Sequence, residues 1–273
     1  MKIIILILSV TGLILLLFFL FSNNSSNSNF TKVENQVTQP KRPVIFLMID
    51  SLMDEPLQKA MKEKRVPALE FLIRNGQYYP NVVSSYPTMS VTIDSTLLTG
   101  TYPDHHNIPG LVWYDEKEKR IVNYGSGKKE IVALGTKKVL KDILYHLNNQ
   151  HLSKLVTTIH EELEKNKKHS ASINGLIYRG DYEQTLDVPK PISFFRLLPK
   201  QLKTNGPILF SFGRFSQFDP NNRYNHFWQN VGFNDHFSAQ EVKYLIQKKK
   251  LPAFTIAYLP SNDHTVHKMD QWL

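Results

Sequence analysis

A hydroxyl that could act as a nucleophile lies within residues 86–100, a stretch with signals for both a helix start and a helix end. Pro87 disfavours helix at the residue before it, Thr88 offers an N-cap, and Gly100 is a typical helix stop. We therefore predict a helix with Ser90 in its first turn. The apolar residues expected to turn inward are Val91, Leu97 and Leu98.

The start of a helix suits Ser90 to phosphate chemistry. The first N–H groups of a helix have no intrahelical acceptor, and the helix dipole favours negative charge there, which makes a site for a phosphate or sulfate group. A hydroxyl in this place becomes a nucleophile when a base or a metal lowers its pKa. The simpler alternative is that Ser90 only caps or fills the first turn.

Two carboxylates stand just beyond apolar runs of the chain. The run 43–49 is followed by Asp50, and the run 251–259 is followed shortly by Asp263. Both runs are typical of buried parallel strands, and ligands bind at the carboxyl ends of such strands in open α/β sheets. For Asp50 the alternative use is to cap the helix that follows.

Asp263 also has a histidine at a useful spacing. His267 follows it by four positions, so one helical turn would place both side chains on one face. A carboxylate and an imidazole together suit a divalent cation such as zinc. His264 is a rival partner, and isolated pairs with this spacing are common by chance.

The elements that must position these residues alternate between helical and strand-like patterns, which predicts an α/β fold. We expect a mostly parallel, doubly wound sheet with helices on both faces. His160, on one of the predicted helices, is expected at the surface. The predicted elements are a helix over 53–75 interrupted near Pro67, strands over 79–85, 111–114 and 170–177, a loop over 101–110, and helices over 136–148 and 152–166.

Trp113 and Tyr114 in the strand 111–114 are candidates for lining a substrate pocket, with core packing as the alternative. Residues 181–234 are rich in aromatic residues and broken by prolines, so we predict an insertion packed over the site or a neighbouring surface. After it, Ser238 and Glu241 match a capping box and predict a helix over 238–250.

The N-terminus is expected to be an anchor. Residues 3–21 form an apolar run, close to the roughly 20 residues that span a bilayer core. We predict a transmembrane segment over 1–22, a flexible tether over 23–42 and one α/β domain over 43–273. This predicts a single-pass protein of the cell membrane with its domain outside the cytoplasm, or a secreted protein if the segment is cleaved.

Composition narrows the range of partners. The net charge is +9 among 273 residues, and the isoelectric point is near 9.4. The lysines are nevertheless dispersed, and the densest run, Lys248 to Lys250, lies at a predicted helix end, where cations are favoured. We therefore expect no nucleic-acid binding. The absence of cysteine from the sequence excludes disulfides and thiolate metal sites.

Three features in this order resemble the alkaline phosphatase superfamily, in its branch of type I phosphodiesterases and nucleotide pyrophosphatases. One is a strand that ends in a metal-binding Asp, matched by 44–50. The second is the nucleophile segment Pro-Thr-x-(Ser/Thr), which runs to Thr-Gly-x-Tyr-Pro-x-x-His and is matched by 87–106. The third is a strand followed by Asp-x-x-x-His, matched by 263–267. The resemblance covers residues 42–268.

The resemblance implies a metal-dependent phosphoric ester hydrolase that acts on small phosphate esters. Asp50 and Ser90 would be ligands of one divalent ion, and Asp263 and His267 of a second, with zinc or manganese as the metals. Ser90 would form a covalent phospho-enzyme that water then cleaves. Many relatives carry Thr where this chain has Ser90. The position of a phosphate-contacting Asn in the nucleotide pyrophosphatases falls by count near Leu111, and this departure from the family pattern argues against nucleotide diesters as substrates.

The resemblance also implies a second half of the domain, with an Asp-His pair and a last His that complete the two metal sites. Here only six residues follow His267, and each metal keeps two protein ligands where a catalytic zinc typically has three. We expect an incomplete alkaline phosphatase-like domain from a truncated or frameshifted reading frame, with little or no turnover. The alternatives are an intact membrane-tethered phosphoesterase that recruits ligands from a partner chain, and a catalytically dead, membrane-tethered module that binds an anionic ligand.

Overall fold

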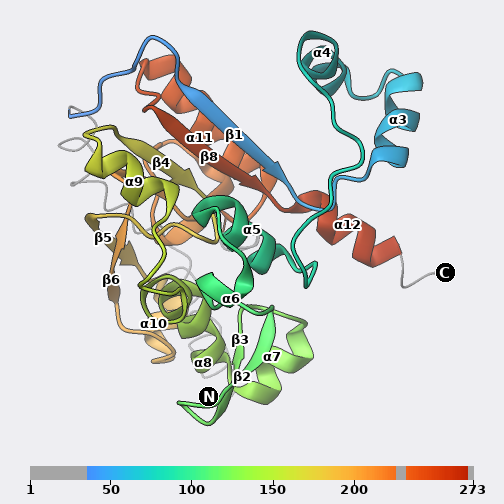
Figure 1. Ribbon diagram of the computed structural model, residues 1–273. Coiled ribbons are helices and arrows are strands. Elements are labelled where there is room, and N and C mark those ends of the chain that lie inside the picture. Colours follow the sequence, from blue (N-terminus) through green and yellow to red (C-terminus); the bar gives the residue numbers. More distant parts are fainter. Residues whose placement is uncertain (1–35, 226–231, 270–273) are drawn as a thin grey trace, which may run out of the picture.

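The computed structural model describes residues 36–225 and 232–269 of the chain. At its centre lies a four-stranded, fully parallel sheet in the order β1-β8-β4-β7 (Figure 1). The predicted α/β class, with a parallel sheet and flanking helices, is therefore confirmed. The strands are β1 (Val44–Ile49), β4 (Ser170–Ile173), β7 (Leu209–Ser211) and β8 (Phe254–Leu259).

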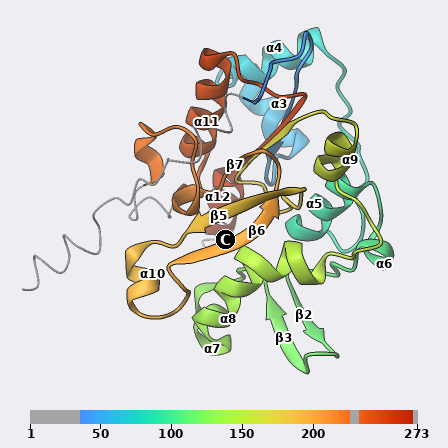
Figure 2. The same cartoon turned by 90° about the vertical axis from the view of Figure 1, so that its left-hand side faces the viewer.

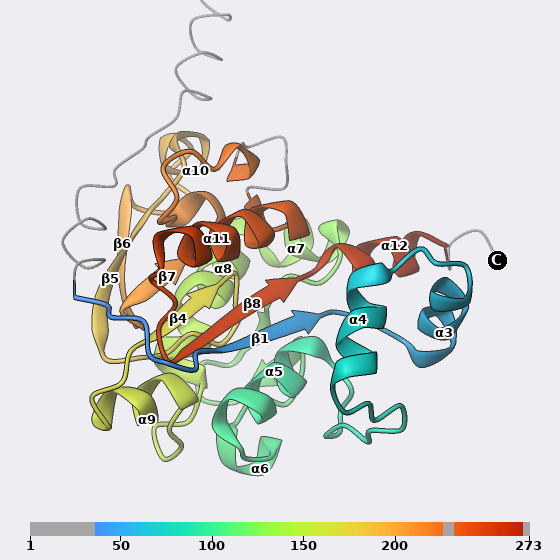
Figure 3. The same ribbon diagram turned by 90° about the horizontal axis from the view of Figure 1, so that it is seen from above.

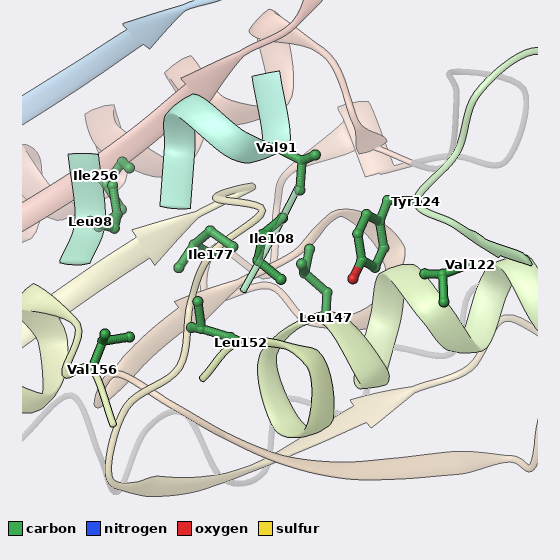
Figure 4. Packing of buried hydrophobic residues seen from close by; sticks show 10 residues of the cluster. All are labelled: Val91, Leu98, Ile108, Val122, Tyr124, Leu147, Leu152, Val156, Ile177 and Ile256. Carbon is green, nitrogen blue, oxygen red and sulfur yellow. The ribbon is translucent and has the colours of Figure 1, made fainter. Parts of the chain in front are cut away.

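Helices cover both faces of this sheet, as Figure 3 shows from above. On one face α5 (Ser90–Thr99) packs Val91 and Leu98 into a cluster that contains Ile256 of β8 (Figure 4). On the other face α11 (Asp235–Lys248) places Leu245 against Ala257. Ile256 and Ala257 are consecutive, and because successive strand residues point to opposite faces, β8 contributes to both hydrophobic layers.

Two antiparallel hairpins flank the sheet, one from β2 (Val112–Asp115) and β3 (Arg120–Asn123), the other from β5 (Tyr182–Asp187) and β6 (Gln201–Gly206) (Figure 2). The predicted strand at 111–114 is thus confirmed with a shift of one residue. The other helices are α3 (Asp54–Lys62), α4 (Pro67–Asn75), α6 (Pro103–His106), α7 (Lys128–Leu134), α8 (Thr136–Lys141), the π-helix η1 (Asp142–His151), α9 (Ile159–Lys165), α10 (Lys190–Phe194), the short 3-10 helices η2 (Gly213–Phe215) and η3 (Arg223–Asn225), and α12 (Ser261–Met269).

The nucleophile segment folds as predicted in outline and differs in detail. Ser90 does open α5, and Gly100 ends it in a left-handed conformation at φ 67°. Thr88 does not cap the helix, because the N-cap is Met89 and no side chain caps this end. Leu97 is 52% exposed rather than buried, since it lies on the outer side of α5 from Val91. Residues 79–85, predicted as a strand, have no regular secondary structure.

Two other predictions about helices were wrong. His160 is fully buried rather than on the surface, because its face of α9 packs on β4, where its Nδ1 lies 2.9 Å from the hydroxyl of Ser170. Ser238 and Glu241 do not form a capping box. The helix starts earlier, with Asn234 accepting a hydrogen bond from the amide of Phe237, so both predicted capping residues lie buried inside α11.

The aromatic segment 181–234 is partly core. Its residues 209–211 form β7 of the central sheet and therefore do not belong to an insertion. Phe210, Phe212 and Phe215 are buried in one hydrophobic cluster with Tyr178.

The predicted helix 152–166 is helical only over α9, because Thr158 and Glu161 form a capping box that starts the helix there.

Strand β1 is not buried as the apolar run predicted. Within residues 36–225 and 232–269 it is the edge of the sheet and pairs only with β8, and the exposed fractions of Val44, Ile45 and Leu47 are 56%, 37% and 43%. The next helices, α3 and α4, project beyond the end of the strand instead of covering it (Figures 1 and 3). The edge of β1 is therefore open to solvent.

The predicted anchor and most of the tether lie outside the described residues. Among the helices of residues 36–225 and 232–269, none combines the length and the apolar character needed to cross a bilayer.

Candidate active site

The predicted nucleophile and the first predicted metal ligand meet at the carboxyl end of β1. The hydroxyl Oγ of Ser90 lies 3.1 Å from Oδ1 and 3.1 Å from Oδ2 of Asp50 and donates its hydrogen bond to this carboxylate. Phe46 and Met48 of β1 pack on the same cluster as α5, and alternation along the strand places Asp50 on that face too. The contact therefore follows from the packing of α5 on β1.

A tyrosine from the neighbouring strand completes the environment of Asp50. The hydroxyl of Tyr258 donates a short hydrogen bond to Oδ2 of Asp50. Tyr258 is the register partner of Met48 in the parallel pair β1–β8, so it faces the same side of the sheet. Burial, the hydrogen bond to Asp50 and the negative charges of Asp50, Asp94 and Asp263 all raise the pKa of Tyr258, so its hydroxyl keeps its proton.

Asp263 lies next to this pair. Its Oδ1 accepts a hydrogen bond of 2.6 Å from Ser51, the residue directly after Asp50. The amide of Asn262 donates to the backbone carbonyls of Asp50 and Ser51 at 3.0 and 2.8 Å, which fixes the start of α12 to the end of β1. Two carboxylates that are far apart in the sequence are thus held at one strand end.

The predicted Asp-x-x-x-His pair is formed within α12. Nε2 of His267 lies 3.3 Å from Oδ1 of Asp263, and the His267 side chain is 72% exposed. The rival, His264, makes no ion pair with Asp263 in the described part of the chain and is exposed. One carboxylate oxygen and one imidazole nitrogen therefore lie side by side on one face of this helix, with the imidazole exposed.

A third carboxyl, which sequence reasoning missed, belongs to the same region. Asp94 lies one turn after Ser90 on α5 and is only 4% exposed, and its Oδ2 has no hydrogen-bond partner among the residues that the structure describes. Burial and the negative charge of Asp50 raise the pKa of Asp94 well above its ordinary value. An unpaired buried carboxylate is costly, so this environment calls for a proton or a cation.

The amino end of α5 is open to an anion. Met89 takes the N-cap position without a capping side chain, and its carbonyl accepts the amides of Thr92 and Ile93. The amides of Ser90 and Val91 come earlier and have no acceptor within the helix. These two N–H groups, with the helix dipole, favour a phosphoryl group beside the Ser90 hydroxyl.

The two predicted substrate-binding aromatics are not joined to this cluster by any described interaction. Trp113 packs against the hydrophobic cluster of α5, and its indole meets the ring of His151 edge-on at 5.4 Å. Tyr114 points the other way on β2 and is 57% exposed. Core packing accounts for Trp113, and the substrate role of both residues stays a prediction.

His106, the last residue of the matched nucleophile segment, has a supporting place. It is fully buried, its Nδ1 accepts the amide of Ile108 at 3.1 Å, and its Nε2 lies 3.2 Å from Oγ1 of Thr96 on α5. Burial lowers the pKa of His106, which keeps it neutral near pH 7. It therefore holds the loop after α5 against that helix rather than facing Ser90.

A second group of possible metal ligands lies away from β1. Ligand atoms of Asp142, His146 and His151 on η1 lie within 4.8 Å of one another. Arg120 already binds both oxygens of Asp142, at 2.8 and 2.9 Å, and His146 binds the same carboxylate at 2.8 Å. A guanidinium thus occupies the place where a cation would neutralise Asp142, and we interpret this group as an ion-pair network.

The cluster at β1 fits divalent cations in the kind of atoms it offers. Asp50 and Ser90 supply oxygens, and Asp263 and His267 supply an oxygen and an imidazole nitrogen, all suited to zinc or manganese. The unpartnered Oδ2 of Asp94 is a separate sign that positive charge belongs here. These residues fit a metal site, and their roles as ligands remain predictions.

Some members of this cluster carried a usable signal in the sequence. Asp94 follows Ser90 by four positions, the spacing that places two side chains on one helix face. Ser51 and Asn262 flank the predicted acidic residues. Tyr258 could not be found this way, because its place depends on the register between β1 and β8.

Comparison with known proteins gives a family and a partial structural likeness. The family of type I phosphodiesterases and nucleotide pyrophosphatases matches residues 44–271. Murine ectonucleotide pyrophosphatase/phosphodiesterase 5 is similar in structure at 12% identity and a TM-score of 0.48, over 83% of this chain and 45% of its own.

Phosphonoacetate hydrolase from Sinorhizobium meliloti, solved with phosphonoformate and with phosphonoacetate, is similar at 14% identity with TM-scores of 0.43 and 0.42, over 82% of this chain and 49% of its own. The chain thus spans about half the length of the solved structures it matches. The comparison with curated proteins found no match.

Proposed function

Because this chain belongs to the family of type I phosphodiesterases and nucleotide pyrophosphatases, we propose that it is a metal-dependent phosphoric ester hydrolase with Ser90 as its nucleophile. The observation that supports this most directly is the contact of the Ser90 hydroxyl with both oxygens of Asp50 at 3.1 Å. A serine that only filled the first turn of a helix would not be expected to bind a carboxylate at the end of a distant strand. The substrate class is a small phosphate ester, as the family description implies.

In the proposed reaction Ser90 Oγ attacks phosphorus. A new Oγ–P bond forms, the bond from phosphorus to the ester oxygen breaks, and the leaving oxygen takes the bonding electrons and a proton from water. Asp50, which accepts the Ser90 hydrogen bond, receives the hydroxyl proton. Water then attacks the phosphoryl-serine and the Oγ–P bond breaks. Asp50 returns its proton to Ser90 Oγ, which restores the hydroxyl, and the proton that the attacking water releases replaces the one taken up by the leaving oxygen.

Other residues orient these groups. Tyr258 donates to Oδ2 of Asp50 and so fixes the carboxylate that faces Ser90. The amides at the start of α5 are placed to bind phosphoryl oxygens, where charge develops during the reaction. Ser51 and Asn262 tie α12 to the end of β1, which keeps Asp263 beside the site.

Asp50 and Ser90 would hold one divalent cation, zinc or manganese, and Asp263 and His267 a second. Such ions, when bound, lower the pKa of a hydroxyl and stabilise the negative charge of phosphoryl oxygens. Together with the helix terminus, they would make the phosphate ester the preferred ligand of this strand end.

We also propose that the apolar run 3–21 anchors the protein in the cell membrane with the domain outside the cytoplasm. The length of the run and the polar, asparagine-rich stretch after it support this. Protease added to intact cells should then remove the domain, and protection of the domain would contradict the proposed orientation.

The test of the reaction uses the full chain, purified and supplied with zinc or manganese. Release of nitrophenol from bis(nitrophenyl) phosphate, however slow, should require the metal and should fall to background in Ser90→Ala. Ser90→Thr should retain part of the activity, because a hydroxyl stays in place. Ser193→Ala, which removes a serine on α10, is the matched control and should leave the rate unchanged.

Two results would contradict the proposal. One is activity of Ser90→Ala equal to that of the unaltered chain. The other is a chain that binds neither zinc nor manganese and hydrolyses no phosphate ester, the behaviour expected of a binding module.

A further inference from the structure

Asp94 is a buried carboxyl beside the candidate site, and the described residues offer its Oδ2 no hydrogen-bond partner. Only 4% of Asp94 is exposed to solvent. Among the described residues no ion pair to it occurs either. Burying an ionised carboxylate costs several kcal/mol unless it is paired or binds a cation. Asp94 therefore needs an explanation that packing alone does not give.

The direction of the Asp94 side chain follows from helix geometry. Side chains on an α-helix tilt toward its amino end, and residues four apart lie on one face. Asp94 thus leans from the second turn of α5 toward Ser90, whose hydroxyl is held by Asp50. The carboxyl of Asp94 is also close enough to Asp50 and to Tyr258 to interact electrostatically with both.

We propose that Asp94 is the third protein ligand of the cation held by Asp50 and Ser90. This deepens the proposed function and rests on it. It would give this cation site three protein ligands within residues 50–94, the number typical of catalytic metal sites. The additional ligand comes from the helix that carries the nucleophile.

The donor set also indicates the kind of cation. Two carboxylates and a hydroxyl are all oxygen donors, and such a set suits manganese or magnesium better than zinc, which favours nitrogen and sulfur. The pair Asp263 and His267, with its imidazole, suits zinc. We therefore infer two sites of different preference, with Mn²⁺ favoured at Asp94.

The competing explanation is a neutral, protonated Asp94 that merely fills space in α5. The two differ in the effect of Asp94→Asn, which keeps the size of the side chain and removes its charge. If Asp94 only fills space, Asp94→Asn should leave metal binding unchanged. If Asp94 is a metal ligand, the same substitution should weaken metal binding.

The experiment titrates the full chain with Mn²⁺ and follows the free ion by electron paramagnetic resonance. Asp94→Asn should weaken Mn²⁺ binding at one site by about tenfold or more, the range seen when groups around a metal are removed. Thr92→Val is the matched control, because Oγ1 of Thr92 is also buried on α5 without a partner. It should bind Mn²⁺ within about twofold of the unaltered chain, as expected for a residue that is no ligand.

A ligand exchange guards against loss of folding in Asp94→Asn. The natural sequence has no cysteine, so Asp94→Cys introduces a single thiol, and a thiolate prefers soft metals. One equivalent of Cd²⁺ should produce a thiolate-to-metal absorption band in Asp94→Cys. Thr92→Cys should not show this band at the same Cd²⁺ concentration.

The outcomes separate this inference from the proposed function. Mn²⁺ binding by the unaltered chain that is unchanged in Asp94→Asn, or no Cd²⁺ band in folded Asp94→Cys, overturns the role of Asp94 and leaves the Ser90 site standing. An unaltered chain that binds no divalent ion overturns both. Circular dichroism of each variant at the same temperature shows whether the fold is kept.

Discussion

Ser90 and Asp50, forty positions apart in the sequence, share a hydrogen bond in which the serine Oγ lies 3.1 Å from each carboxylate oxygen. The symmetric position leaves the hydroxyl bound to the carboxylate as a whole rather than to one oxygen. This relationship underlies the proposed reaction.

Tyr258→Phe removes the hydroxyl that holds Oδ2 of Asp50. We expect phosphodiesterase activity and metal affinity to fall by about tenfold or more, because partners that orient a metal ligand have effects of that size. The unfolding free energy should fall by only about 1 kcal/mol for one lost hydrogen bond. Tyr79→Phe, at an exposed tyrosine, should change neither quantity. If Tyr258→Phe keeps full activity and full metal affinity, the Tyr258 hydroxyl has no role in orienting Asp50 for the reaction.

Because His160 is buried, we expect the unfolding free energy of the chain to fall in acid. Burial lowers its pKa from 6.5 to about 3 in the folded chain. The unfolded chain therefore binds a proton between pH 6.5 and 3 that the folded chain does not, and the unfolding free energy falls as pH falls through this range. From pH 7 to pH 4.5 the loss due to His160 should be about 2 to 3 kcal/mol.

The measurement is urea unfolding at pH 7 and pH 4.5 for the unaltered chain and for His160→Asn, which can still bond to Ser170. The variant should lose less stability over this range than the unaltered chain. His105→Asn, at an exposed histidine, should keep the original slope. Equal slopes for His160→Asn and the unaltered chain would show that His160 is not buried in its neutral form.

For Glu241 we expect the opposite pH dependence of the unfolding free energy, a loss of stability as pH rises. Burial raises its pKa to about 7, although its carboxylate accepts hydrogen bonds from Ser211 and Asn222 at 2.7 Å each. Between pH 4.5 and 7 the folded chain holds a proton that the unfolded chain has lost, so the contribution of Glu241 to stability falls as pH rises through this window. Above pH 7 the accumulated loss reaches about 3 kcal/mol.

Glu241→Gln cannot ionise, so its stability relative to the unaltered chain should improve from pH 4.5 to pH 8. Thermal unfolding at these two pH values measures the change. The control is Glu55→Gln at an exposed residue of α3, which should show the same pH dependence as the unaltered chain. A difference that is constant with pH would contradict the raised pKa of Glu241.

The open edge of β1 predicts self-association. An exposed apolar edge strand presents unpaired backbone groups to other chains, and Leu47 is 43% exposed on this strand. Leu47→Lys should weaken association of a chain that starts after the apolar run 3–21, as measured by light scattering over a concentration series. Leu155→Lys, at a residue that is 96% exposed outside any strand, is the control and should have no effect. If both variants associate equally, the β1 edge is not the surface through which the chains associate.

The sequence determined the elements that carry the chemistry. The run before Asp50 and the run before Asp263 are strands, the segment after Pro87 is a helix that begins at Ser90, and Asp263 pairs with the histidine four positions later. These are local properties, fixed by apolar periodicity, helix boundaries and spacing within one turn. For the same reason the family could be identified from short motifs in order.

The tertiary structure decided which of these elements meet and which side chains become buried. The contact between Tyr258 and Asp50 depends on the register of β1 and β8, which is set by packing across distant segments. Ser238 and Glu241 match a capping box by spacing, yet α11 begins earlier because Asn234 caps it and its buried face needs both residues inside. Burial of His160 and isolation of Asp94 likewise depend on neighbours from other strands, which no local pattern in the chain contains.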